Sequence, residues 1–139
     1  MASRTVAAIA AVVEMTAGFA LIVSPSFVVH LLIGSALSDG GIAIGRVGGF
    51  GLLSLGLACW PNRRVANAQA ISGLFIYNLL ATLYIGFLGV AGGFAGYLLW
   101  PACVLHAVLA FLLARPVYRA VRRQGLGAEV QNVSNAPPK

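Results

Sequence analysis

The sequence predicts an all-α membrane protein: a transmembrane four-helix bundle with both termini on the cytoplasmic side and a short interfacial helix between the first two spans. The 139-residue chain is 60% hydrophobic and has a mean hydropathy of +0.92. Only 9% of its residues are charged, whereas a soluble domain carries about 25%. Its apolar segments are continuous and close to the ~20 residues that a membrane-spanning helix needs, unlike the alternating strands of a β-barrel.

Four apolar segments are the predicted spans, and they cover residues 5–23, 42–60, 70–90 and 97–114. They leave little room for a separate soluble domain, so we expect one transmembrane domain over residues 1–115. The remainder, 116–139, begins with a basic juxtamembrane segment. It continues as a tail without a periodic apolar pattern, which we predict to be disordered unless a partner orders it. A cleavable signal peptide is the alternative for the first segment, but a charge in its core and the lack of a small-x-small site argue against it.

The basic residues predict the orientation of the spans. All but one lie in the N-terminal segment, in the connection between spans two and three, or after span four: Arg4, Arg63, Arg64, Arg115, Arg119, Arg122, Arg123 and Lys139. Four spans place these segments on one side, and an excess of Lys and Arg marks the cytoplasmic side. The net charge of +6 is therefore a topology signal, and we expect no nucleic-acid partner because no basic soluble surface exists to bind one.

The connection between spans one and two predicts a short helix. Ser24 followed by Pro25 resembles a helix start, and apolar residues recur at helical spacing as far as Gly34. Such a segment either lies in the outer interface or dips between the spans. His30 lies on it and is a secondary site candidate, either as an interfacial side chain or as a gate or ligand above the bundle interior.

Each span contains one strongly polar residue, and these four are the primary candidates for binding a ligand or a proton: Glu14, Arg46, Asn78 and His106. Glu14 lies roughly 13 Å from the outer end of its span at the helical rise of 1.5 Å per residue. Asn78 and His106 fall near the same level, and Arg46 about a turn above. An ionisable residue at this depth is a functional-site hypothesis by default.

Small residues share helix faces with Glu14 and His106, which predicts that these side chains point into the bundle. Arg46 either extends outward to the interface or turns inward to pair with Glu14, and His106 is the other candidate partner. The polar layer either fixes helix packing or binds a ligand, a proton or a quinone. Tyr77 and Tyr84 are secondary candidates because their hydroxyl groups need partners within a membrane.

Neither metal binding nor catalysis is expected. Two histidines at different levels and one carboxylate do not form a recognisable set of metal ligands, and no cofactor is predicted. The spacings contain no Ser-His-Asp or Cys-His arrangement, so we expect a protein that is not an enzyme.

Several short motifs carry a family resemblance. They are the Glu of span one, a Gly-rich second span that begins with Arg46 and ends LGLACW, the YN at residues 77–78, and LWPA before His106. Over residues 13–115 the chain resembles small bacterial four-helix membrane proteins that are broadly DoxX-like. That resemblance implies a bundle in the bacterial cytoplasmic (inner) membrane and mostly no settled activity. Span one also resembles the small multidrug resistance transporters, whose embedded Glu, at the position of Glu14, exchanges protons for cationic drugs.

Three functional hypotheses follow. The first is a small non-enzymatic membrane protein, either an accessory subunit of a complex or an orphan bundle, with a buried polar cluster. The alternative is a proton-linked carrier of a small hydrophobic or cationic solute. The third is a quinone-contacting redox membrane anchor. The expected partners are membrane lipid and either other membrane subunits or a second copy of the chain.

Overall fold

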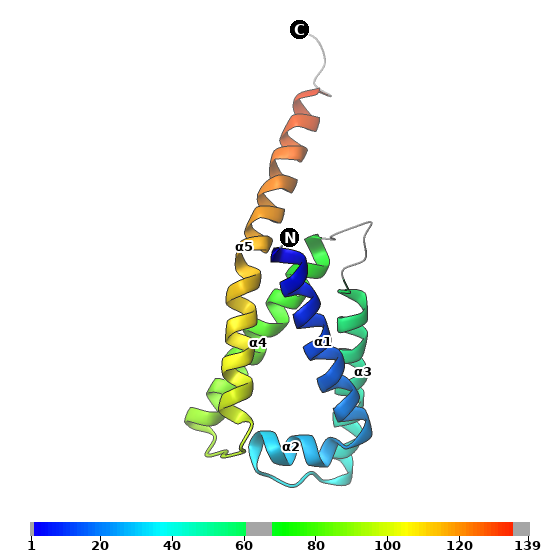
Figure 1. The fold of residues 1–139 in the computed structure, drawn as a ribbon, viewed down its shortest axis with the longest axis vertical. Helices are drawn as coiled ribbons and strands as arrows, with labels where there is room; N and C mark the ends of the chain where they lie inside the picture. Colours follow the sequence, from blue (N-terminus) through cyan, green and yellow to red (C-terminus); the bar gives the residue numbers. More distant parts are fainter. Residues whose placement is uncertain (1, 61–67, 135–139) are drawn as a thin grey trace.

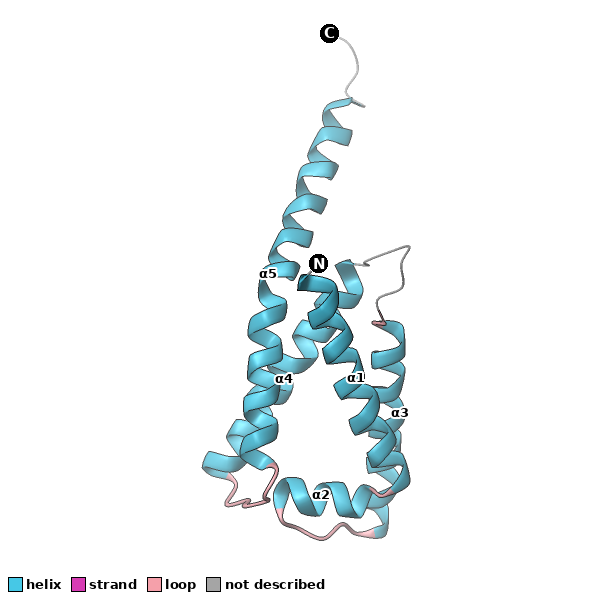
Figure 2. Cartoon of the chain, viewed as in Figure 1, coloured by secondary structure: helices cyan, strands magenta, loops and turns pink. Residues whose placement is uncertain are grey.

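A computed structural model describes residues 2–60 and 68–134, which form five helices. They are α1 (Ala2–Val23), α2 (Pro25–Ile33), α3 (Asp39–Ala58), α4 (Ala68–Ala91) and α5 (Leu99–Ser134). The described part of the chain contains no strand (Figure 2). The predicted all-α class is therefore confirmed.

Four of these helices are long and apolar enough to cross a membrane: Arg4–Val23, Asp39–Ala58, Gln69–Ala91 and Leu99–Arg119. They correspond to the four predicted spans, although the last continues to Arg119 rather than ending at residue 114. Their outer surfaces expose large apolar side chains, among them Phe19, Leu83 and Phe111. Extended apolar surface of this kind suits helices that face lipid.

Helices α1 and α3 form one closely packed pair because glycine lets their backbones touch. A Cβ atom added to Gly18 would lie 2.7 Å from the Gly49 carbonyl oxygen, and one added to Gly56 would lie 2.7 Å from the Ala11 carbonyl oxygen. Small residues allow this close approach where two helices meet in a membrane. Gly49 and Gly56 of the glycine-rich second span are therefore used in contact with α1, whereas Gly48 and Gly51 face open space.

Helices α4 and α5 form the other pair, and the described contacts between the two pairs run from the end near the N-terminus to the level of Glu14. Figure 1 shows α1 and α3 converging with α4 and α5 near the N-terminus and separating from them toward α2. The predicted short helix is present as α2, with Pro25 in its first turn and the left-handed Gly34 (φ 75°) at its C-cap. It crosses the far end and joins the other pair through a 2.8 Å hydrogen bond from the Leu98 amide to the Leu31 carbonyl.

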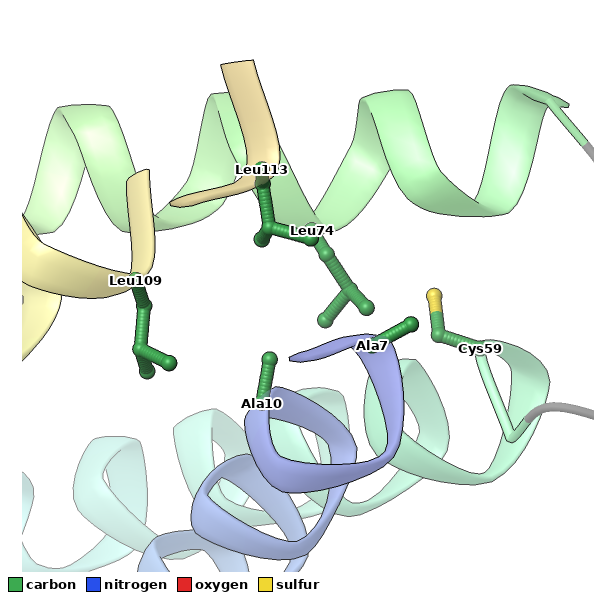
Figure 3. Close-up of a cluster of buried hydrophobic side chains, with 6 residues drawn as sticks. All are labelled: Ala7, Ala10, Cys59, Leu74, Leu109 and Leu113. Atoms are coloured by element: carbon green, nitrogen blue, oxygen red, sulfur yellow. The ribbon is translucent and has the colours of Figure 1, made fainter. Parts of the chain in front are cut away.

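A cluster of buried apolar side chains holds the two pairs together where they converge (Figure 3). It contains residues from α1, α4 and α5 and the residue that follows α3: Ala7, Ala10, Leu74, Leu109, Leu113 and Cys59. The Cys59 thiol also donates to the Ala70 carbonyl at 3.3 Å. We call this set the apolar cluster. The predicted polar residues lie next to it.

The C-terminal segment differs from the prediction. We expected a disordered tail, but α5 is helical through Ser134, well beyond its apolar span. The prediction relied on the missing apolar periodicity. A helix that is already nucleated extends at little further cost without such a pattern, and Pro116 lies inside α5 without ending it. Residues 135–139, and with them Lys139, lie outside the described residues, as do Arg63 and Arg64.

Candidate functional site

Three of the predicted polar residues meet directly beside the apolar cluster. Glu14 follows Ala10 by one helical turn on α1, and Asn78 follows Leu74 by one turn on α4. Residues four apart share a helix face, so the faces that build the apolar cluster also carry these side chains inward. Glu14 and Asn78 are both 0% exposed, and the His106 side chain on α5 is 12% exposed.

The Asn78 amide connects the other two side chains. Its Nδ2 donates to Glu14 Oε1 at 3.1 Å and to the Leu74 carbonyl at 2.9 Å. Its Oδ1 lies 2.8 Å from His106 Nδ1. Both amide hydrogens therefore point at acceptors, which fixes the orientation of the amide. We call Glu14, Asn78 and His106 the polar network.

The orientation of Asn78 also fixes one proton on His106. An amide oxygen only accepts hydrogen bonds, so His106 Nδ1 carries a hydrogen and donates it to Asn78 Oδ1. The same Nδ1 lies 3.9 Å from Glu14 Oε1, beyond hydrogen-bonding distance. The sequence offered Arg46 and His106 as alternative partners for Glu14. In the structure His106 is the one that lies close to the carboxyl group, and Asn78 hydrogen-bonds to both.

One atom of the polar network has no partner among the described residues. Glu14 Oε2 is buried and forms no hydrogen bond. A buried, unpaired carboxylate oxygen costs several kcal/mol, on the order of the penalty for an uncompensated charge. A neutral carboxylic acid avoids most of that cost, so the site favours a proton on Glu14.

Arg46 does not join the polar network. Of the two placements predicted for it, the structure has the exposed one on α3, and no described ion pair links it to Glu14. The predicted layer of four residues is thus a network of three. Arg46 lies next to Gly45, which packs against Pro25 at the start of α2, near the end of the bundle where the helix pairs have separated.

Of the three secondary candidates, one contacts the polar network and two do not. The Tyr77 ring meets the His106 ring edge-on, with centroids 5.9 Å apart, so Tyr77 helps to hold the imidazole in place. Tyr84 is 64% exposed and His30 is exposed on α2. Neither belongs to the polar network.

Two further hydrogen bonds of Asn78 were not predicted. Its side-chain amide donates one hydrogen to the Leu74 backbone carbonyl. Its backbone carbonyl accepts a hydrogen bond from the Thr82 hydroxyl at 2.8 Å. A Thr one turn after an Asn was a usable signal for the second contact, because a helical hydroxyl commonly bonds the carbonyl four residues earlier. Nothing in the sequence marks the Leu74 carbonyl.

The chemistry available to the polar network is proton binding and hydrogen bonding. It contains one carboxyl group, one amide and one imidazole, and the carboxyl group is shut off from the surface. Among the residues that the structure describes, no three His, Cys, Asp or Glu side chains come close enough together to hold a metal ion.

Comparison with protein-family models, curated proteins and solved structures finds no match to the chain. The resemblance to DoxX-like proteins and to the small multidrug resistance transporters therefore stays a prediction.

Proposed function

We propose that this chain is a non-enzymatic protein of the bacterial inner membrane that serves as an accessory subunit of a larger membrane assembly. Four apolar helices cross the bilayer, and both termini lie in the cytoplasm. The polar network fastens the α1–α3 pair to the α4–α5 pair. The distribution of basic residues supports this orientation, and the exposed apolar surface supports burial in lipid.

The observation that carries the subunit proposal is the extension of α5. The helix continues past Arg119 to Ser134 and projects beyond the rest of the bundle (Figure 1). The extension projects past the other described helices, whereas most helix stability in proteins comes from tertiary packing. Arg115, Arg119 and Arg122 recur at helical spacing, and all three side chains are exposed. An acidic surface on a partner subunit would neutralise this basic face and stabilise the extension.

Charge reversal tests this proposal. The full chain, solubilised in mild detergent from its own membrane, should carry a stoichiometric partner protein. The double variant Arg119→Glu and Arg122→Glu should lose at least 90% of that partner, on the order expected when two charge pairs become repulsive. The matched control Arg119→Lys and Arg122→Lys keeps the charge and should retain it. An isolated homodimer without any other protein, unaffected by charge reversal, would contradict the subunit role.

The second candidate function is a proton-linked carrier of a small hydrophobic or cationic solute. It is favoured by one observation: Glu14 Oε2 is buried and has no hydrogen-bond partner among the described residues. A carboxyl group that binds a proton reversibly is what such coupling needs. Uptake of a lipophilic cation into proteoliposomes should then depend on an imposed proton gradient and should stop in Glu14→Gln. Binding that is unchanged between about pH 5 and pH 9, or that survives Glu14→Gln, would exclude the carrier.

A further inference from the structure

We propose that Glu14 is a proton-binding site inside the bundle and that His106 is the residue through which the proton enters and leaves. The proposal deepens the second candidate function and rests on the same carboxyl group. It nevertheless concerns proton binding alone, so a bundle that transports nothing can still satisfy it.

The surroundings of the Glu14 carboxyl group favour its protonated form. Its Oε1 accepts a hydrogen bond from Asn78, while its Oε2 is buried without a described partner. No described ion pair to Lys or Arg compensates a negative charge there, because Arg46 is exposed. A proton on Glu14 removes the charge, leaves the hydrogen bond from Asn78 intact, and is the less costly way to bury this group.

His106 offers a route by which a proton can reach Glu14. His106 is the ionisable neighbour in the polar network, and its side chain is 12% exposed while Glu14 and Asn78 are 0% exposed. Asn78 itself cannot relay a proton, because an amide does not titrate in the accessible range. An imidazole can accept a proton on one ring nitrogen and release another from the second. His106 is therefore the ionisable group that links the buried carboxyl group to the part of the polar network that is not fully buried.

A proton moves between the surroundings and Glu14 through the two nitrogens of the His106 ring. During uptake, the lone pair of His106 Nε2 accepts a proton from outside, and the ring becomes an imidazolium. Nδ1 then gives its proton to the ionised Glu14 at Oε1: the N–H bond breaks, an O–H bond forms, and a neutral acid remains beside an imidazole that carries its proton on Nε2. Uptake of a second proton at Nδ1 and loss of the one on Nε2 restore the Nδ1–H form that donates to Asn78 Oδ1. Nδ1 and Oε1 are 3.9 Å apart, so a closure of about 1 Å brings them to hydrogen-bonding distance. Release is the reverse.

The other described titratable groups near Glu14 and His106 do not bond to the Glu14 carboxyl group, so proton exchange is assigned to Glu14 and His106. Tyr77 on α4 contacts the His106 ring with its own ring edge-on. Cys59, after α3, lies in the apolar cluster and donates its thiol to the Ala70 carbonyl. Arg46 on α3 and His30 on α2 are exposed. No other described titratable side chain forms a hydrogen bond or ion pair with the Glu14 carboxyl group.

The acid content of the chain allows a direct test without changing the site. The sequence has three acidic residues, Glu14, Asp39 and Glu129. In a Glu129→Gln protein supplied with ¹³C-labelled glutamate, Glu14 is the one labelled side-chain carboxyl group, and its infrared band reports its protonation in lipid nanodiscs. We expect the band of a carboxylic acid at neutral pH, which shifts when the protein is moved into D₂O. A carboxylate band in its place would overturn the proposal.

The exchange rate tests the role of His106. In His106→Gln, the shift of the Glu14 band after transfer to D₂O should slow at least tenfold, whereas the matched control His30→Gln should exchange as the parent does. Thermal unfolding of both variants establishes that the bundle is intact. If His106→Gln unfolds, the rate is measured in Tyr77→Phe and Tyr77→Ala: loss of the ring that holds the imidazole should alter exchange in Tyr77→Ala alone. Unchanged exchange in His106→Gln, or in Tyr77→Ala where that is the variant measured, overturns the relay. Solute transport is not measured in either experiment, so a failed carrier proposal leaves these outcomes unaffected.

Discussion

Asn78 on α4 donates a hydrogen bond to Glu14 on α1, 3.1 Å between Nδ2 and Oε1, at the level where the two helix pairs meet. Both side chains are fully buried. The contact joins residues 64 positions apart in the chain, and the partner of Asn78 on its other side is His106 on α5. One non-ionisable side chain thus hydrogen-bonds to both an acid and a base, which form no hydrogen bond with each other.

Removal of the Asn78 amide should destabilise the bundle. Asn78→Ala leaves Glu14 Oε1 and His106 Nδ1 without their partner, and each buried unsatisfied group costs about 1–3 kcal/mol. Unfolding by denaturing detergent in mixed micelles measures the loss. Leu80→Ala on the same helix is the matched control because Leu80 is 59% exposed, and it should change the unfolding free energy by less than about 0.5 kcal/mol.

The contact between α1 and α3 predicts unequal effects at two glycines. Gly18→Ala places a Cβ atom 2.7 Å from the Gly49 carbonyl oxygen and 2.6 Å from the Leu53 amide nitrogen. Because both are backbone atoms, the helices must separate, and we expect a loss of about 1–3 kcal/mol. Gly48→Ala has open space and should be neutral or slightly stabilising. Equal effects in the two variants, measured by thermal unfolding, would contradict the close contact.

The packing of α2 against the segment that precedes α5 should be disrupted by a side chain at Gly96. This glycine is buried, and a Cβ atom added to it would overlap the Leu32 backbone. Gly96→Ala should therefore weaken the attachment of α2 to α5 and increase hydrogen exchange at the Leu98 amide, which bonds the Leu31 carbonyl. The control Gly40→Ala has no atom within 4 Å of its added Cβ. Protection of the Leu98 amide that survives Gly96→Ala would argue against this contact.

The proposed orientation predicts opposite labelling at two positions. In a background without Cys59 and Cys103, a single cysteine at Ser38 should react with an impermeant maleimide on intact cells, since it precedes α3 at the outer end. A single cysteine at Arg122 should react only after the membrane is opened. Labelling of the Arg122 position on intact cells would reverse the assigned orientation.

Much of the fold was predictable from the sequence because lipid imposes strong constraints. A helix must satisfy its own backbone in a bilayer, so length and continuous hydrophobicity located all four candidate spans. Pro25 and Gly34 bracketed α2 because each has a conformational preference that marks a helix end. The α5 extension was missed because its helicity depends on continuation from the span rather than on an apolar pattern.

The level of each candidate residue along its helix was predictable, but the rotation of the helices about their axes was not. Helical rise placed Glu14, Asn78 and His106 near one level, and small residues on their faces suggested that they point inward. The direction of Arg46 depends on how α3 is turned against α1, which the contact of Gly49 with Gly18 decides. Whether Asn78 or His106 touches Glu14 depends on helix offsets of a few ångströms, which spacing along one chain does not determine.

The most direct test asks whether Glu14 and Asn78 act together in fastening the helix pairs. A double-mutant cycle with Glu14→Ala, Asn78→Ala and the combined variant, read as unfolding free energies in micelles, measures their coupling. We predict a favourable coupling of about 0.6–1.7 kcal/mol, the range of hydrogen bonds between membrane helices. If the loss in the double variant equals the sum of the two single losses within about 0.3 kcal/mol, the two side chains are not coupled. That result would mean that the polar network does not join the two pairs.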